Sequence, residues 1–527
     1  MLTKSPSYDA LVAGFVWDIP ATYNIGVDVC DKWAGTHPKR TAIIDLTGPS
    51  RRDCNFSELK ELSDNLALHL AGLGVRRGDR VGVLRSQSIW TAAAHIAIWK
   101  LGAISMPLFT LFRAEALLSR LEDSGASVVI CDQESQNLIE PLQDQLPALN
   151  HIICPEQIKL PDHDPHFKPV KTAAADPAIL IYTSGTTGPA KGALLPHRTL
   201  LGHLPGVEFS HDFLPQPDDC LWTPADWAWI GGLLDVLLPA LHHGVPVVAA
   251  RMNKFTAKGC LEIIKTANVR NVFFPPTALK MLMAEDVKIS GLRSVASGGE
   301  PLGTALLEWG KSALGLTINE FYGQTECNMI VSACGALFST PDGYIGRPTP
   351  GHTVAVIDNN GKETHDEGDI AVRKDTPVMM LGYWQNPEAT AAKFRGDWML
   401  TGDRGQMVDG YIRFVGRDDD VITSAGYRIG PSAIENCLLR HPAVIGAAVV
   451  GKPDEKRTEI VKAYVKLRAG LIGDNELVAE LQSHVADNLA AHEYPREITF
   501  VDAFPMTVTG KIIRKDLKAR AAMEGTT

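Results

Sequence analysis

An alternation of short apolar strands with helices is the feature that most limits how this chain can fold. Strands are predicted at residues 80–84, 103–107 and 127–131, and helices at residues 89–101 and 113–123. Parallel neighbouring strands must be joined by a crossover about as long as a helix, which is the spacing found here. The pattern therefore predicts βαβ units around a mostly parallel sheet.

The same rhythm returns at residues 245–283 and then changes near the C-terminal end. After the charged, glycine-flanked segment 416–420, the order becomes helix, strand, strand, helix, strand, with Asp474 as the expected N-cap of the second helix. At 527 residues the chain also exceeds the ~250–300 residues that one core supports. We predict an α/β protein with a large N-terminal domain of layered sheets and helices (1–418) and a smaller, mobile α+β C-terminal domain (419–527).

Charge and cysteine content narrow the classes of function. The net charge of −10 is opposite in sign to that of a typical sequence-independent nucleic-acid binder, so no nucleic-acid partner is expected. Neither a signal peptide nor an apolar run long enough to cross a bilayer is visible. Nine Cys without Cys-x-x-Cys spacing favour reduced thiols. We expect a cytoplasmic protein without a membrane span, and a homo-oligomer is compatible with this composition.

A segment rich in glycine and hydroxyl groups follows a buried strand predicted at residues 178–182. Residues 183–192 read Thr-Ser-Gly-Thr-Thr-Gly-Pro-Ala-Lys-Gly. Glycines allow close backbone approach, hydroxyls donate to phosphate oxygens, and Lys191 supplies positive charge. The spacing is not that of a Walker motif, and an ordinary Ser/Thr/Gly turn is the alternative. The density of these residue types favours a phosphate-binding loop.

This loop resembles the signature of the adenylate-forming superfamily, which includes acyl-CoA synthetases, peptide-synthetase adenylation domains and luciferases. Other segments resemble that family's adenine-edge loop, second nucleotide motif, ribose-binding pair, C-terminal opening loop and catalytic-lysine segment, in the family's order. These segments are residues 297–301, 321–326, 401–403 with 416–417, 424–430 and 505–511. The likeness is to short- and medium-chain acyl-CoA synthetases.

The resemblance implies a reaction in two halves. A carboxylate attacks the α-phosphorus of ATP and releases pyrophosphate, and the thiol of CoA then attacks the acyl-adenylate, giving acyl-CoA and AMP. The expected cofactors and co-substrates are ATP, Mg²⁺ and CoA, and the expected partner is a small-molecule carboxylic acid. A carboxylate is already ionised at pH 7, so the chain needs charge neutralisation and positioning rather than a Ser-His-Asp triad.

The resemblance also assigns roles to single positions. Lys511, Thr186, Lys191 and Glu326 are the catalytic candidates, and Glu326 is also the candidate metal ligand. The residues expected to bind ATP or AMP are Thr183, Ser184, Gly185, Thr187, Gly188, Gly299, Glu300, Pro301, Tyr322, Gly323, Gln324, Thr325, Asp403 and Arg417.

For the thiol step the family rotates its C-terminal domain about a joint, where Asp419 matches the hinge. Gly426 would let the pantetheine arm pass without a Cβ clash, and Arg428 is the candidate contact for the charged part of CoA. The family's lysine acts in adenylation only, so Lys511→Ala is expected to block the first half-reaction and spare the second. The segment around Lys511 also matches a pattern of reversible acylation, which makes a lysine acyltransferase and a deacylase candidate partners.

The nature of the acid is predicted from three positions. Acetate-specific members place a pocket-shortening Trp where this chain has Gly323. Trp227 and Trp229 correspond to a region that lines the acyl site, although either could be a core tryptophan. The prediction is a medium-chain, branched or aromatic monocarboxylate, and Gly323→Trp is expected to shift preference toward acetate or propionate.

Two alternatives to an acyl-CoA synthetase stay open. One is a stand-alone adenylation enzyme that loads a carrier protein, although no carrier segment is visible in the sequence. The other is a non-catalytic nucleotide-binding protein, against which the full set of phosphate, magnesium and lysine positions argues.

Overall fold

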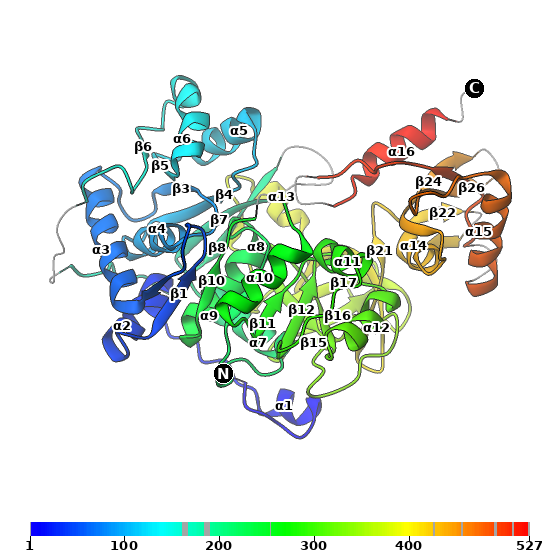
Figure 1. The fold of residues 1–527 in the computed structure, drawn as a ribbon, viewed down its shortest axis with the longest axis horizontal. Helices are drawn as coiled ribbons and strands as arrows, with labels where there is room; N and C mark the ends of the chain where they lie inside the picture. The colour runs from blue at the N-terminus through cyan, green and yellow to red at the C-terminus, as the bar shows by residue number, and fades with distance from the viewer. Residues whose placement is uncertain are drawn as a thin grey trace.

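Four β-sheets organise the described part of the chain, three in the N-terminal region and one at the C-terminal end (Figure 1). The computed structural model describes residues 2–160, 167–183, 190–252, 254–424, 427–454, 457–489, 493–507 and 511–524. The prediction of an α/β protein with a large N-terminal domain and a smaller C-terminal domain is confirmed.

Two large sheets carry the βαβ units that the sequence predicts, and β3, β4 and β5 are parallel. Within the described ranges the first sheet runs, in spatial order, β15 (Arg347–Pro348), β14 (Asn328–Ser332), β13 (Ile318–Gln324), β12 (Ser294–Gly298), β11 (Asn271–Phe273), β9 (Leu221–Trp222), β10 (Val247–Ala249), β1 (Thr41–Asp45) and β2 (Arg52–Asn55). The second runs β18 (Gly382–Tyr383), β8 (Lys191–Pro196), β7 (Pro177–Thr183), β4 (Ile104–Leu108), β3 (Arg80–Leu84), β5 (Val128–Cys131) and β6 (His151–Ile153).

A third, antiparallel sheet follows in the chain and brings its own strands to the site described below. It contains β16 (Val354–Ile357), β17 (Gly368–Arg373), β20 (Trp398–Val408) and β19 (Phe394–Arg395), with β21 (Tyr411–Arg417) paired to β20. The short helices α1 (Tyr8–Gly14), α2 (Lys32–Thr36) and α13 (Pro387–Ala392) lie outside the main layers described next.

Helices fill the space between the two large sheets and cover their outer faces. The inner layer holds α3 (Phe56–Gly72), α4 (Ile89–Lys100), α7 (Thr199–Ser210), α8 (Ile230–Gly232) and α9 (Leu238–His243). The outer layers are α5 (Ala114–Ser124) with α6 (Gln133–Ile139), and α10 (Ala257–Ala267) with α11 (Pro276–Ala284) and α12 (Thr304–Ala313). Every residue of α7 is buried, including the polar His203 and Glu208, whereas α10 buries one stripe at helical spacing.

The C-terminal sheet stands apart at one end of the molecule (Figure 1). Its strands are β23 (Tyr427–Ile429), β22 (Ile422–Ser424), β25 (Thr458–Leu467), β24 (Val444–Asp454) and β26 (Glu497–Phe500). Alternate residues of β24 face opposite sides, so α14 (Pro431–Leu439) and α15 (Asn475–Asn488) cover one face and α16 (Arg514–Met523) covers the other. Asp474 caps α15 as predicted, because its side chain accepts from Leu477 N at 2.9 Å.

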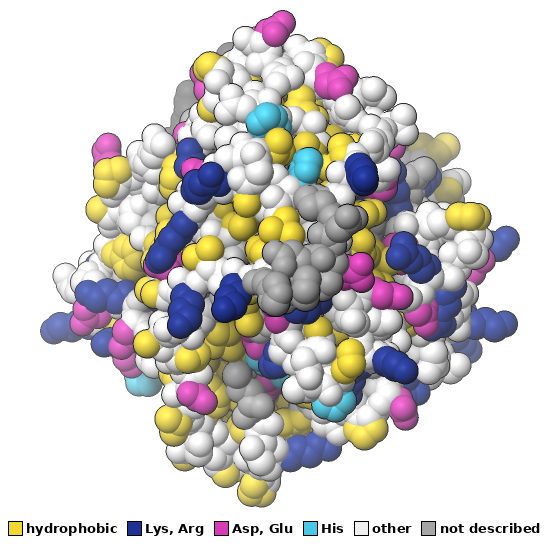
Figure 2. All heavy atoms as spheres, turned by 90° about the vertical axis from the view of Figure 1, so that its left-hand side faces the viewer, with side chains coloured by type: hydrophobic (Ala, Val, Ile, Leu, Met, Phe, Trp, Pro, Cys, Tyr) yellow, Lys and Arg dark blue, Asp and Glu magenta, His cyan; other side chains and the backbone are white. Residues whose placement is uncertain are grey.

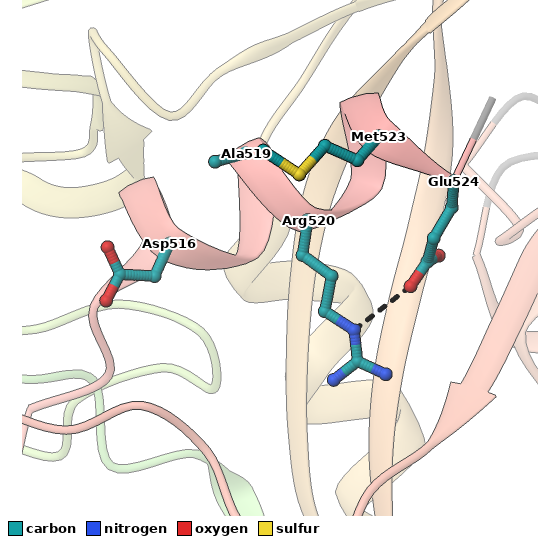
Figure 3. Close-up of a pocket in the computed structure, with 5 residues that line it drawn as sticks. All are labelled: Asp516, Ala519, Arg520, Met523 and Glu524. Carbon is teal, nitrogen blue, oxygen red and sulfur yellow. Dashed lines mark hydrogen bonds and ion pairs between the residues drawn. The ribbon is translucent and has the colours of Figure 1, made fainter. Parts of the chain in front are cut away.

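Helix α16 lies directly after the segment that contains Lys511. Figure 3 shows Arg520 turned toward Glu524, with Nε 3.0 Å from Oε1, while Met523 lies along the helix beside Ala519. On the buried side, the Arg520 guanidinium stacks over the Tyr464 ring at 5.2 Å. The helix is therefore held to β25 by charge and aromatic contacts as well as by its apolar face.

The surface at the end of the molecule that carries α3 mixes both signs of charge. Figure 2 shows Lys and Arg side chains interspersed with Asp and Glu and with apolar side chains on this face. None of the helices in the described ranges combines the length and apolarity needed to cross a bilayer. All nine cysteines are buried and unpaired.

Candidate active site

A hairpin of β7 and β8 anchors the glycine-rich loop. The strands pair as far as Thr183 opposite Lys191, and Thr183 Oγ1 donates to the Lys191 carbonyl at 3.3 Å. The two ends of the loop are therefore side by side. The predicted phosphate-binding positions Ser184, Gly185, Thr186, Thr187 and Gly188 lie outside the described residues.

Glu326 lies between β13 and β14 and is 6% exposed. Tyr383 Oη donates to Glu326 Oε1 at 2.5 Å, and Lys191 Nζ is 5.5 Å from the centroid of the same ring. Burial and the negative charge of Glu326 raise the pKa of Tyr383 above its ordinary value, so the phenol is neutral at pH 7. The structure thus brings Lys191 and Glu326 together on either side of one tyrosine.

The environment of Glu326 fits a hard divalent cation. Its hydrogen-bond partner is the Tyr383 phenol, and no Lys, Arg or His in the described ranges forms an ion pair with it, so no protein cation competes with a metal ion for this carboxylate. The described residues also hold no group of three or more His, Cys, Asp or Glu that could bind a metal. A Mg²⁺ ion on a nucleotide usually takes only one or two protein carboxylates and is otherwise held by phosphate oxygens and water.

A second carboxylate lies where β13 meets the third sheet. Tyr322 Oη donates to Asp403 Oδ2 at 2.5 Å, and Asp403 pairs with Arg417 across β20 and β21. Burial raises the pKa of Asp403, whereas the hydrogen bond from Tyr322 and the positive charges of Arg417, Lys393 and Lys511 act in the opposite direction. Groups from four separate segments therefore converge on this carboxylate.

Lys511 of the C-terminal domain reaches the same place. A Cβ built on Gly299 would lie 3.8 Å from Lys511 Nζ, and the φ of +99° at Gly299 lies in the region that favours glycine. Two hydrogen bonds join Lys511 to Thr507, since Lys511 N donates to Thr507 Oγ1 at 3.0 Å and the Lys511 carbonyl accepts from Thr507 N at 2.7 Å. The lysine segment thus faces the N-terminal domain beside Asp403.

Other predicted nucleotide residues follow the ends of neighbouring strands. Gly299, Glu300 and Pro301 come directly after β12, and Thr325 comes directly after β13, which is parallel to β12. In open α/β sheets, ligands bind outside the carboxyl ends of the strands. These positions are therefore at the edge where a ligand is expected.

Lys393 is a cation at this site that sequence reasoning missed. Its Nζ is 3.0 Å from Gln324 Oε1 and 3.4 Å from the Thr401 carbonyl, and Gln324 Nε2 donates to the same carbonyl at 2.9 Å. The lysine thereby fixes the end of β13 against β20. Lys393 and Tyr383 sit in a stretch without a recognised motif, so only the tertiary contacts reveal them.

The two predicted acyl-pocket tryptophans have different surroundings. Trp227 is fully buried in the core between the two large sheets. Trp229 is half-buried, and its ring centroid is 5.1 Å from that of Phe109 and 5.9 Å from that of Phe112. Trp227 therefore has the packing of a core residue, whereas Trp229 belongs to an aromatic cluster just after the carboxyl end of β4.

Gly323 has no room for a side chain in this backbone. A Cβ there would lie 1.7 Å from the Asn328 carbonyl oxygen, because the β13–β14 register shifts between Tyr322 and Gly323. The expectation that an indole at this position would simply shorten the pocket is therefore corrected. Gly323→Trp must first displace the backbone of β14, so it is not a clean test of pocket length.

The residues predicted for the thiol step lie at the start of the C-terminal domain. Gly426 falls outside the described residues, as does the side chain of Arg428, whose backbone pairs with β22. The Asp419 carbonyl accepts a hydrogen bond from Lys518 of α16. The predicted hinge residue Asp419 is therefore hydrogen-bonded to α16, the helix that follows Lys511.

Comparison with known proteins agrees with this arrangement. The AMP-binding enzyme family matches residues 30–384, and the AMP-binding enzyme C-terminal domain matches residues 433–511. The chain is 34% identical to acyl-coenzyme A synthetase ACSM2, mitochondrial, of Rattus norvegicus, covering 95% of this chain and 92% of that one. It is 33% identical to the acetyl-coenzyme A synthetase of Bacillus subtilis, over 94% and 90% of the two chains. The crystal structure of the anthranilate CoA ligase AuaEII with anthranoyl-AMP superposes with a TM-score of 0.88 at 28% identity, covering 97% and 99%.

Proposed function

Because the chain belongs to the AMP-binding, adenylate-forming enzymes and is an AMP-forming acid–thiol ligase, we propose that its acid is a medium-chain, branched or aromatic monocarboxylate. The enzyme joins a carboxylic acid to AMP with release of pyrophosphate and then transfers the acyl group to CoA. Its substrates are the acid, ATP and CoA.

The observation that carries this substrate class is the aromatic cluster of Trp229, Phe109 and Phe112. Phe109 directly follows β4, and β4 is the parallel neighbour of β7, whose end leads into the glycine-rich loop. The cluster therefore lies at the same sheet edge as the loop, where an apolar acyl chain or ring would be next to the phosphates. Aromatic side chains favour apolar and aromatic ligands through area burial and ring stacking.

The relatives support this proposal without deciding chain length. One relative is named for anthranilate, an aromatic acid, and another at similar identity is named for acetate. Sequence identity to relatives therefore does not indicate which acid this chain uses. The aromatic cluster of Trp229, Phe109 and Phe112 is the stronger support for the proposed substrate class.

In the first half-reaction the chain positions an ionised carboxylate and offsets phosphate charge. Thr183, Lys191 and the hydroxyls of the loop bind the phosphates of ATP in this proposal. Mg²⁺ held by Glu326 would supply further charge neutralisation. Asp403 accepts from the ribose hydroxyls, and Lys511 adds positive charge beside Gly299, where its amine lies in the structure.

In the second half-reaction the C-terminal domain turns about Asp419 and withdraws Lys511 from the site. Gly426 then leaves space for the pantetheine arm, and Arg428 contacts the charged part of CoA. One site thereby serves both steps, which explains why a small domain is appended to a large one.

The proposal also covers modification of the enzyme, its cellular compartment and its oligomeric state. Lys511 is exposed, which supports its modification by a lysine acyltransferase, and acylation would remove the charge that the first step needs. Nine free cysteines support a reducing cytoplasm. A homo-oligomer stays a prediction that the elution volume of the purified protein tests.

The decisive experiment measures pyrophosphate release with acids from acetate to decanoate and with benzoate-type acids, each with and without CoA. We expect kcat/KM to be highest for a medium-chain, branched or aromatic acid and CoA to be consumed stoichiometrically. Highest kcat/KM for acetate would overturn the proposed substrate class. Pyrophosphate release with acyl transfer only to a carrier protein would replace CoA as the acceptor.

A further inference from the structure

Tyr383 is held rigidly between the phosphate hairpin and Glu326. It belongs to β18, where Gly382 and Tyr383 pair antiparallel with Leu194 and Ala193 of β8. Its backbone N–H donates to Thr390 Oγ1 at 2.8 Å, so both edges of this short strand are fixed. The ring is 9% exposed and cannot move without disturbing the hairpin.

The same short segment also holds the backbone of Glu326. Met380 N donates to the Glu326 carbonyl at 2.9 Å, while Tyr383 Oη donates to the carboxylate at 2.5 Å. Residues three apart in one segment therefore fix Glu326 at two points. The phenol engages one carboxylate oxygen, Oε1, so Oε2 is the oxygen that a cation would bind.

The ring of Tyr383 also separates two opposite charges. Lys191 Nζ lies 5.5 Å from its centroid, over the ring, whereas Glu326 contacts its hydroxyl. A direct Lys191–Glu326 pair would neutralise both groups and leave neither for the nucleotide. A cation–π contact holds the lysine without cancelling its charge.

We infer that Tyr383 is a positioning residue that orients Glu326 for the divalent cation and keeps Lys191 apart from it. This inference rests on the proposed role of Glu326 as the metal ligand. Hydrogen-bond partners of metal ligands fix ligand orientation, and their loss typically weakens metal binding about 10–100-fold. The role is thus expected to appear in metal affinity rather than in nucleotide affinity.

The test measures binding of Mn²⁺, as a probe for Mg²⁺, to the full-length protein with a non-hydrolysable ATP analogue, using the electron paramagnetic resonance of free Mn²⁺. For Tyr383→Phe we expect about tenfold weaker Mn²⁺ binding. Affinity for the metal-free analogue, measured by calorimetry, should change less than about twofold, because Tyr383 does not itself contact the phosphates in this proposal.

A double-mutant cycle separates positioning from general loosening of β18. In the Glu326→Gln background, Tyr383→Phe should have no further effect on Mn²⁺ binding, because the group that it orients has lost its charge. The matched control is Tyr23→Phe, which removes a similar phenol–carboxylate bond, from Tyr23 Oη to Asp28 Oδ2 at 2.7 Å. This control should leave Mn²⁺ binding unchanged.

Unchanged or tighter Mn²⁺ binding in Tyr383→Phe overturns the inference, and so does an equal loss in Tyr23→Phe or in the Glu326→Gln background. If Glu326→Gln itself leaves Mn²⁺ binding unchanged, the metal role of Glu326 in the proposed function is lost as well. If only Tyr383→Phe leaves Mn²⁺ affinity unchanged, the positioning role of Tyr383 is wrong. If Glu326→Gln leaves it unchanged, the metal role of Glu326 is wrong.

Discussion

Glu320 shows how burial in one strand changes the charge of a single side chain. It precedes Tyr322 by two residues on β13, so both side chains point to the same face of the sheet. Its carboxylate accepts from Leu302 N at 3.3 Å, and burial raises the pKa of Glu320 from 4.5 to about 8. The folded protein therefore favours the protonated acid over a wide pH range.

Glu320→Gln is expected to change how stability depends on pH. The folded pKa is raised, so the stability from the protonated acid is complete below about pH 4.5 and is lost as pH rises to about 8. Gln carries no charge and escapes this loss. From pH 5 to pH 8.5 the variant should gain at least about 1.4 kcal/mol in free energy of unfolding relative to the native protein, which corresponds to one pKa unit.

Urea unfolding at the two pH values measures this difference. The control is Glu61→Gln, because Glu61 is an exposed residue of α3. A constant difference between Glu320→Gln and the native protein at both pH values would show that the carboxyl does not titrate as stated.

Elements with a strong local pattern were predictable from the sequence. The strand over residues 80–84 agrees with β3, because it is a short, mostly apolar run bounded by polar or turn residues. The two-residue strand β18 has no such signal. It forms because β8 offers a free edge far away in the chain, and this pairing places Tyr383 beside Glu326.

The candidate site likewise contains residues that the sequence predicted and residues that it did not. Motif residues such as Asp403 and Lys511 were predicted, and the structure brings them together. The role of Lys393 could not be predicted, because it contacts Gln324, which is distant in sequence. The lack of room at Gly323 could not be predicted either, because it depends on a register shift between β13 and β14 that has no sequence signal. The spacing of motifs along the chain predicts which residue types take part in the chemistry. Contacts between backbone segments in the folded protein determine which positions have room for a side chain.

The ion pair between Arg514 and Glu435 is expected to contribute strongly to the attachment of helix α16. Arg514 binds Glu435 of α14 with both guanidinium NH groups, one of them at 2.8 Å, and its Nε is 3.5 Å from Asp420. Removing one partner leaves a partly buried charge unpaired, so Arg514→Gln should destabilise the C-terminal domain by roughly 3 kcal/mol. Hydrogen exchange of β24 and β25 in the native protein and the variant measures this loss.

Lys515→Gln is the matched control on the same helix. Lys515 is exposed, and surface substitutions away from buried contacts usually change stability by less than about 0.5 kcal/mol. Equal hydrogen-exchange effects of the two substitutions would show that Arg514 does not clamp α16 onto the domain.

The arrangement of the whole molecule predicts opposite defects from two substitutions. Lys511 faces Asp403 in this structure. In the proposed mechanism, adenylate formation therefore needs no domain movement, whereas thioester formation needs rotation about Asp419. Proline fixes φ near −65° and restricts the preceding residue. Asp419→Pro should therefore leave adenylate formation within about threefold and slow thioester formation from supplied acyl-adenylate at least about tenfold. Lys511→Ala should do the reverse.

Both half-reactions are measured separately, by pyrophosphate release without CoA and by acyl-CoA formation from synthetic acyl-adenylate. Asp419→Ala controls for loss of the Asp419 side chain, since alanine leaves the backbone free to rotate, and Lys515→Ala controls for loss of an exposed lysine on α16. If Asp419→Pro and Asp419→Ala slow thioester formation equally, the side chain and not the rotation is responsible. If Lys511→Ala slows both halves equally, Lys511 stays in the site throughout, and a two-position C-terminal domain is no longer needed to explain how one site performs two reactions.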